Sequence, residues 1–173
     1  MELNKIVWLL IALLLALLPA CYHMRAEAEP IPPRVITLPG QPQDIVRKIR
    51  TLIEEGWHCR ILETDSTGTV LITAPYHFKT DTSVGQPAGG RKYYTQLRIE
   101  IQQTNGTVTA HLSHYNFEIR TSYAYNDYSK QGVGTMYKHY PYEEYPGMFD
   151  LDLINHEMDR VSTEIQKLFR EYK

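Results

Sequence analysis

The sequence predicts an α+β fold in which an antiparallel sheet of four or five strands carries an N-terminal helix and a long C-terminal helix on one face. Apolar residues recur at helical spacing before residue 57 and again from residue 151, and they alternate at strand spacing in between. Each expected helix has one apolar stripe, and a sheet with one apolar face can cover both stripes. The predicted order is a helix, two β-hairpins and a helix, within one domain over residues 35–173.

The first helix is expected to begin at Pro42 and to end at Gly56, because proline suits the first helical position and glycine the position after the last. Charged residues occupy one face and apolar residues the other. The apolar positions are Ile45, Val46, Ile49, Leu52 and Ile53. Residues 35–38, before this helix, fit a short edge strand.

The first hairpin is predicted from alternation on both sides of a turn. The apolar positions are Trp57, Cys59 and Ile61 on one strand and Val70, Ile72 and Ala74 on the next. A four-residue turn would pair Thr64 with Thr69 and set Ile61 opposite Ile72 on the inner face. Cys59 is then a small buried core residue.

The second hairpin is marked by an Asn-Gly turn at residues 105–106, a strong hairpin signal. Its register sets Ile99 opposite Leu112 on the inner face and Glu100 opposite His111 on the outer face.

Beyond residue 112 the alternation changes phase, which predicts one extra residue, a β-bulge, near residues 113–114. This bulge would turn Tyr115 inward against Leu97. It would also pair Phe117 with Thr95 and Ile119 with Tyr93.

The chain closes with a helix whose apolar residues step by three and four. They are Leu151, Ile154, Met158, Val161, Ile165, Leu168, Phe169 and Tyr172. Such a stripe could form a coiled coil with a partner, but it covers only about three heptads. Packing on the domain's own sheet is therefore favoured.

The N-terminus resembles the export signal of a bacterial lipoprotein. Lys5 precedes an apolar run over residues 6–18, which is too short to span a bilayer. The sequence Leu-Pro-Ala-Cys that ends at Cys21 is similar to the lipobox of signal peptidase II substrates. This resemblance implies removal of residues 1–20 and acylation of Cys21, which would attach the protein to a lipid bilayer. The alternative is an ordinary secretory signal cut after Ala20.

Residues 21–34 are rich in proline and are expected to form an extended spacer that holds the domain tens of ångströms from the membrane. Tyr22 is not the aspartate that resembles an inner-membrane retention signal, so the outer membrane is favoured. Cys59 is the second of two cysteines and would have no internal disulfide partner once Cys21 is acylated.

The predicted element order resembles the helix-grip domains of small periplasmic lipoproteins, such as the lipoprotein C subunit of the outer-membrane β-barrel assembly machinery. The similarity rests on the Gly56-Trp57 end of the first helix and on the amphipathic last helix. It implies a sheet that grips a long helix. No functional residue is carried over, because no specific motif supports the likeness.

The composition and motifs exclude several function classes. A net charge of −2 with scattered basic residues argues against nucleic-acid binding. The chain has no nucleophile elbow and no zinc-binding helix motif, so neither catalysis nor a cofactor is expected. The alternative metal site combines His111, His114 and Glu100, because the expected bulge turns both histidines outward. An exposed cross-strand pair of Glu100 and His111 is the simpler interpretation.

A segment at about residues 120–149 is unusually rich in tyrosine. Eight of the thirteen tyrosines lie between residues 115 and 145. Tyrosine provides wide amphipathic contacts at low entropic cost, so the segment is either a recognition surface or a loop that covers the sheet's second face. No clear periodicity is visible, which indicates a long loop. The candidate contact residues are Tyr123, Tyr125, Tyr128, Tyr137, Tyr140, Tyr142 and Tyr145, and those from residue 137 onward are expected to be exposed.

The sequence thus predicts a non-catalytic, lipid-anchored protein of the bacterial cell envelope that acts as a scaffold or interaction module. Its expected partner is another envelope protein. The alternatives are a binder of glycan or peptidoglycan and then a periplasmic metal-dependent enzyme.

Overall fold

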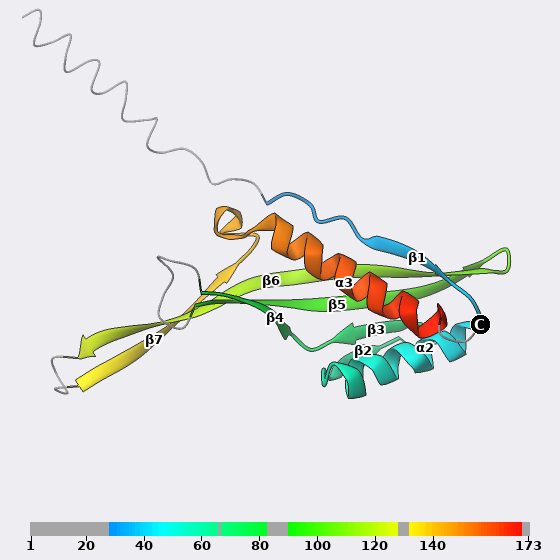
Figure 1. Ribbon diagram of the computed structural model, residues 1–173, viewed down its shortest axis with the longest axis horizontal. Helices are drawn as coiled ribbons and strands as arrows, with labels where there is room; N and C mark the ends of the chain where they lie inside the picture. Colours follow the sequence, from blue (N-terminus) through cyan, green and yellow to red (C-terminus); the bar gives the residue numbers. More distant parts are fainter. Residues whose placement is uncertain (1–27, 66, 83–89, 128–131, 171–173) are drawn as a thin grey trace, which may run out of the picture.

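The computed structural model describes residues 28–65, 67–82, 90–127 and 132–170 of the chain. It shows an α+β fold with a seven-stranded antiparallel sheet and two main helices (Figure 1). The predicted export signal and Cys21 lie outside the described residues. The predicted count of four or five strands is too low, because β4 (Tyr76–Asp81) and β7 (Gly132–Pro141) were not anticipated.

A long two-stranded ribbon forms the centre of the sheet. Its strands are β5 (Arg91–Thr104) and β6 (Thr107–Asp127). On one side, β1 (Arg34–Leu38) and β7 pair with different parts of β6. On the other side, β3 (Val70–Thr73) and β4 pair with different parts of β5, and β2 (Ile61–Thr64) lies at the edge beside β3.

Both helices pack on one face of this sheet, as predicted. Helix α2 (Pro42–Thr51) continues into a π-helical turn, Leu52–Gly56, and α3 spans Leu151–Arg170. One core cluster contains side chains of α2, α3 and the sheet together. Its fully buried members include Ile45, Ile49, Ile53, Leu97, Ile99, Val161 and Ile165. The apolar stripe of α3 is therefore buried against the sheet of its own domain, as predicted, and is not left exposed for a coiled coil.

The second hairpin has the predicted register. Ile99 pairs with Leu112, and Glu100 pairs with His111. Neither Ile99 nor Leu112 has any exposed surface, so the inner face of this ribbon is the one the alternation indicates.

The β-bulge is present, but it lies at Asn116 rather than at residues 113–114. The register shifts by one residue between Tyr94 and Gln96, and Asn116 has a φ of 50°, a left-handed conformation that asparagine tolerates. The regular alternation therefore continues past residue 112. His114 is buried on the inner face and Tyr115 lies on the outer one, the reverse of the prediction.

The register predicted for the first hairpin is wrong. Thr64 pairs with Leu71, and Ile61 pairs with Thr73. The carboxylate of Asp65 accepts a hydrogen bond from the Val70 N–H at 2.7 Å and so holds a longer turn than expected. Leu71 and Thr73 consequently face inward, in place of Val70 and Ile72.

A second core cluster lies where α3 begins. Phe117, Tyr142, Ile154 and Met158 form it, and Ala28 and Ile31 pack against it. The Tyr142 hydroxyl also donates a hydrogen bond to the Glu29 carbonyl at 3.1 Å. Ala28, Glu29 and Ile31, from the segment predicted to be an extended spacer, therefore contact the domain.

Candidate interaction surface

The tyrosine-rich segment is mostly a β-hairpin, not the long loop that was predicted. Strand β6 continues to Asp127, and β7 pairs with it from Glu118 to Asp127. The pairing of β6 with β5 ends at Arg120, and beyond this residue β6 pairs with β7 alone. We call residues 121–127 and 132–138 the arm; Figure 1 shows it projecting beyond the part of the sheet that the helices cover.

The candidate tyrosines divide into exposed and buried ones. Tyr137 is 74% exposed and Tyr145 is 43% exposed, whereas Tyr123 and Tyr140 are half-buried. Tyr142 is only 5% exposed, which contradicts its predicted exposure, because its ring packs in the second core cluster. Tyr125 pairs with Gly134 in the arm, but its side chain lies outside the described residues, as does the whole of Tyr128.

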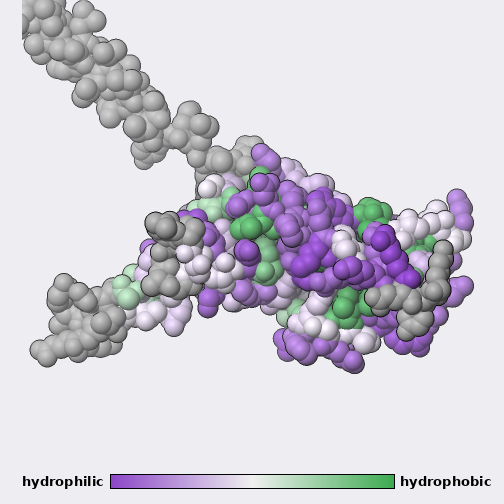
Figure 2. Space-filling view, in the orientation of Figure 1, coloured by the Kyte–Doolittle hydropathy of each residue, from purple (hydrophilic) through white to green (hydrophobic). Residues whose placement is uncertain are grey.

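The register of β6 and β7 gives the arm two different faces. Ser122 pairs with Tyr137, so Tyr137 lies on the outer face, away from the helices. Ile119 pairs with Tyr140 and Tyr123 pairs with Met136, so these residues lie on the inner face. In Figure 2 the arm is pale with a green area, in contrast to the deep purple of the helix surface.

A shallow hollow of about 170 Å³ lies at the outer face where the arm leaves the sheet. The residues that line it are Gly90, Lys92, Tyr94, Arg120, Thr121, Ser122 and Tyr137. The Arg120 guanidinium lies 4.1 Å from the centre of the Tyr94 ring and donates hydrogen bonds to Glu118. Aromatic rings, cations and the Ser122 hydroxyl thus converge here, a combination that suits the carboxylates, amides and rings of a protein partner.

The comparisons with known proteins assign no family. No protein-family model and no curated protein matches the chain. Within the part of the chain that the structure describes, no helix is long and apolar enough to cross a membrane. The function is therefore inferred from the arrangement of the described residues.

The three residues of the alternative metal site are not brought together. His111 faces outward opposite Glu100, while His114 is 5% exposed and lies on the inner face. The prediction that both histidines point outward is wrong, because the bulge at Asn116 comes after both of them. No group of three or more metal-ligating side chains is placed for a metal ion within the described ranges.

Sequence reasoning missed a buried polar network between α3 and the sheet. Glu157 is 5% exposed, yet both of its carboxylate oxygens accept hydrogen bonds from Arg160, each at 2.7 Å. The Tyr76 hydroxyl donates a third hydrogen bond to Glu157, at 3.0 Å. Arg160 also binds Glu164, whose other oxygen accepts a hydrogen bond from the Trp57 indole at 2.6 Å. The sequence does indicate that Glu157 is buried, because it falls within the apolar stripe of the helix.

His114 completes the network from the sheet side. Its Nε2 lies 3.2 Å from the Tyr76 hydroxyl, whose proton is already donated to Glu157. Nε2 is therefore the donor in this hydrogen bond, and the buried Nδ1 has no partner. Burial, followed by the nearby positive charge of Arg160 and Arg34, lowers the pKa of His114 to about 4.

The network joins α3 to the sheet. Burial and the adjacent Glu157 carboxylate raise the pKa of Tyr76, so its hydroxyl stays protonated. A hollow of about 520 Å³ beside the network is lined in part by Trp57, Cys59 and Arg160. Burial also raises the pKa of the Cys59 thiol, so the thiol stays protonated at neutral pH.

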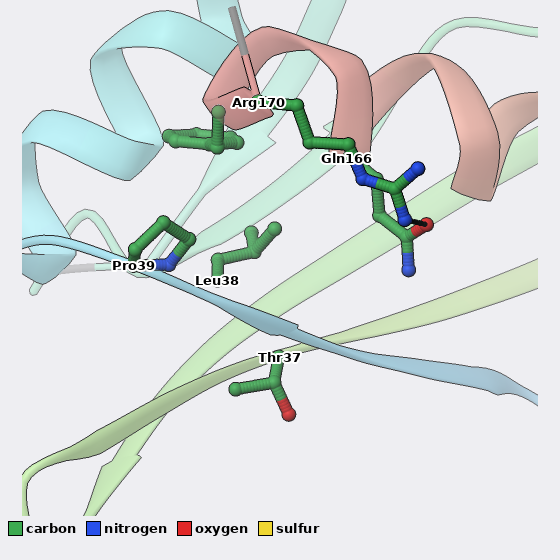
Figure 3. Close-up of a pocket in the computed structure, with 6 residues that line it drawn as sticks. Thr37, Leu38, Pro39, Gln166 and Arg170 are labelled. Carbon is green, nitrogen blue, oxygen red and sulfur yellow. Dashed lines mark hydrogen bonds between the residues drawn. The ribbon is translucent and has the colours of Figure 1, made fainter. Parts of the chain in front are cut away.

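Another hollow, of about 450 Å³, lies between the end of β1 and the end of α3 (Figure 3). Leu38 points toward the helix and Thr37 points away from it, while Arg170 donates a hydrogen bond to Gln166 at 3.5 Å. Because its polar groups bind each other rather than converge on the space, this hollow is not a candidate site.

Proposed function

We propose that the protein is a non-catalytic, lipid-anchored interaction module of the bacterial cell envelope, held in the outer membrane through acylated Cys21. Its outer arm face binds another envelope protein. The single observation that carries this proposal is Tyr137, which is 74% exposed on a strand that extends past the covered sheet. The order of helices and strands is compatible with the resemblance to helix-grip lipoprotein domains.

An ordered two-stranded ribbon needs packing against another surface to be stable. An isolated hairpin is marginally stable in water. Large aromatic side chains that remain exposed to solvent do not add to its stability, because their apolar surface is not buried. A partner that covers Tyr137 would bury its ring and fill the hollow beside Tyr94 and Arg120. Tyrosine and arginine are the residue types that contribute most to such contacts.

The test is crosslinked co-purification from intact envelopes, comparing Tyr137→Ser with Tyr115→Ser. Tyr115 is a matched control because it lies on the outer face of the same strand ribbon but does not line the hollow. We expect the parent and Tyr115→Ser to capture the same envelope protein and Tyr137→Ser to lose it without a change in Tm. Equal capture by all three proteins would contradict the proposal.

The anchor is tested separately. Cys21→Ser should move the protein from the detergent-extracted membrane fraction to the soluble fraction, or leave its signal uncleaved. Density-gradient separation should place the parent with the outer membrane. Unchanged membrane partition of Cys21→Ser after signal removal would exclude acylation.

Glycan binding is a second candidate, favoured by one observation. The outer-face hollow combines the rings of Tyr94 and Tyr137 with the hydroxyl of Ser122, which also suits a sugar. Retention on purified peptidoglycan that Tyr137→Ser abolishes would favour this function over protein binding.

A further inference from the structure

We propose that the inner face of the arm and its base lies against the lipid bilayer, so that the membrane sets the orientation of the whole domain. We call this surface the membrane face. Its residues are Tyr123, Met136, Lys138, Tyr140 and Tyr145. The inference rests on the proposed acylation of Cys21, and it deepens the proposed function by assigning the two faces of the arm to two partners.

The tether between Cys21 and the domain is short. Ala28 and Ile31 pack against the second core cluster, and the Glu29 carbonyl accepts the Tyr142 hydrogen bond. Only six residues separate Cys21 from Ala28. At about 3.3–3.6 Å per residue these seven steps reach at most about 25 Å. The part of the domain beside Ala28 therefore stays close to the bilayer.

The domain is much longer than this tether. Strand β6 has 21 residues, which span roughly 70 Å at about 3.3 Å each. The far hairpin, at Asn105, is at the other end of this strand from the arm. The short tether therefore favours membrane contact at the arm end over contact at the far hairpin.

The membrane face adjoins the point where the tether leaves the domain. Tyr142, which binds Glu29, lies 5.1 Å ring to ring from Phe149. Tyr140 and Tyr145, on either side of Tyr142 in the chain, pack edge to face at 5.2 Å. The exposed base of the arm is thus directly beside the start of the domain.

The membrane face continues the apolar side of the sheet, but no helix among the described residues covers it. Tyr140 pairs with Ile119, which has no exposed surface. Further along the arm, however, Met136 is 44% exposed, and Tyr145 at the base is 43% exposed. The helices that bury the rest of this face do not shield these two side chains.

The chemistry of the membrane face matches the headgroup region of a bilayer. Tyrosine concentrates there because its ring is apolar and its hydroxyl remains hydrated. The Lys138 ammonium lies 5.2 Å from the centre of the Tyr123 ring and can reach lipid phosphates. Glu143 and Glu144 are exposed in the adjacent turn, so the contact is shallow and does not enter the hydrocarbon core.

The test uses the full acylated protein in vesicles of phosphatidylethanolamine and phosphatidylglycerol. Cys59→Ala removes the buried thiol, and a nitroxide is attached at Met136→Cys or Tyr145→Cys. Tyr137→Cys, on the outer face of the same arm, and Asn105→Cys, at the far hairpin, are the controls. Collision with a water-soluble nickel chelate is measured before and after reconstitution.

We expect a several-fold drop in chelate collisions at residues 136 and 145 on reconstitution, and little change at residues 137 and 105. Collisions that are equally frequent at all four positions, in protein that floats with the vesicles, would overturn the inference and leave the anchor intact. Protein that does not float would instead remove the anchor and the inference together.

Two further outcomes would identify another occupant of this face. Protection that disappears when the protein is diluted in excess lipid would indicate a second copy of the chain. Protection that appears only after another envelope protein is added would indicate a protein contact. Either result would overturn the assignment of the membrane face to lipid, whereas protection that persists on dilution in pure lipid supports it.

Discussion

His114 lies on the inner face of β6 with a neutral ring whose Nδ1 has no hydrogen-bond partner. Its pKa of about 4 is below the 6.5 of an unperturbed histidine. Between these values the unfolded chain binds a proton that the folded chain does not. The free energy of unfolding therefore falls as the pH drops below about 6.5, by a total of about 3 kcal/mol once the pH is below about 4.

We predict that His114→Gln flattens this pH dependence. Glutamine keeps an amide donor for Tyr76 but does not titrate. Urea denaturation of the parent and of the variant at a series of pH values between about 4.5 and 7 measures the difference. His111→Gln, on the outer face opposite Glu100, is the control and should keep the parent's slope.

Two tyrosines close together in the sequence should respond oppositely to the same substitution. Tyr142 is 5% exposed and its hydroxyl is bonded, so Tyr142→Ser should lower the free energy of unfolding by about 3–5 kcal/mol. Tyr137 is 74% exposed, so Tyr137→Ser should cost less than about 0.5 kcal/mol. Similar losses in urea denaturation would mean that Tyr137 is a packing residue and not a contact residue.

At the scale of an element, α3 depends on the ion pair between Glu157 and Arg160. Glu157→Ala should lower the free energy of unfolding by about 3 kcal/mol, because Arg160 and Tyr76 lose their shared acceptor inside the protein. Thermal and urea unfolding measure this loss. The double variant Glu157→Met with Arg160→Met removes both charges and should cost less than the single change. A larger loss in the double variant would show that the pair itself supplies net stability.

At the scale of the whole molecule, the N-terminal segment contributes to the fold. A chain that starts at Arg34 loses the packing of Ala28 and Ile31 and the bond from Tyr142 to Glu29. We expect it to fold, with a free energy of unfolding about 2 kcal/mol below that of a chain that starts at Ala28. Urea denaturation of the two chains provides the comparison. Equal stability would mean that residues 28–31 act as part of a free spacer, so that the tether to the membrane is longer than the contacts of Ala28 imply.

Local periodicity was sufficient to predict the helices and strands that have one apolar face. Residues close together in the chain determine the apolar stripes of α2 and α3 and the face that each helix buries. They also determine the register of the Asn-Gly hairpin. The same reasoning failed for the arm because a two-stranded ribbon with both faces uncovered has no apolar alternation to detect. It also missed β4, although the half-buried Tyr76 and Phe78 alternate there with the exposed His77 and Lys79.

The sequence by itself determined that the chain has two amphipathic helices on one face of an antiparallel sheet, because burial of an apolar stripe is a local requirement. Only the tertiary structure decided where the bulge lies. A change of phase shows that an extra residue is present but not which one, and a strand shifted by one residue turns every side chain to the other face. That choice placed His114 in the core beside Tyr76. Likewise, a buried Glu157 is explained only when the fold brings it within reach of Tyr76, which is 81 residues away in the chain.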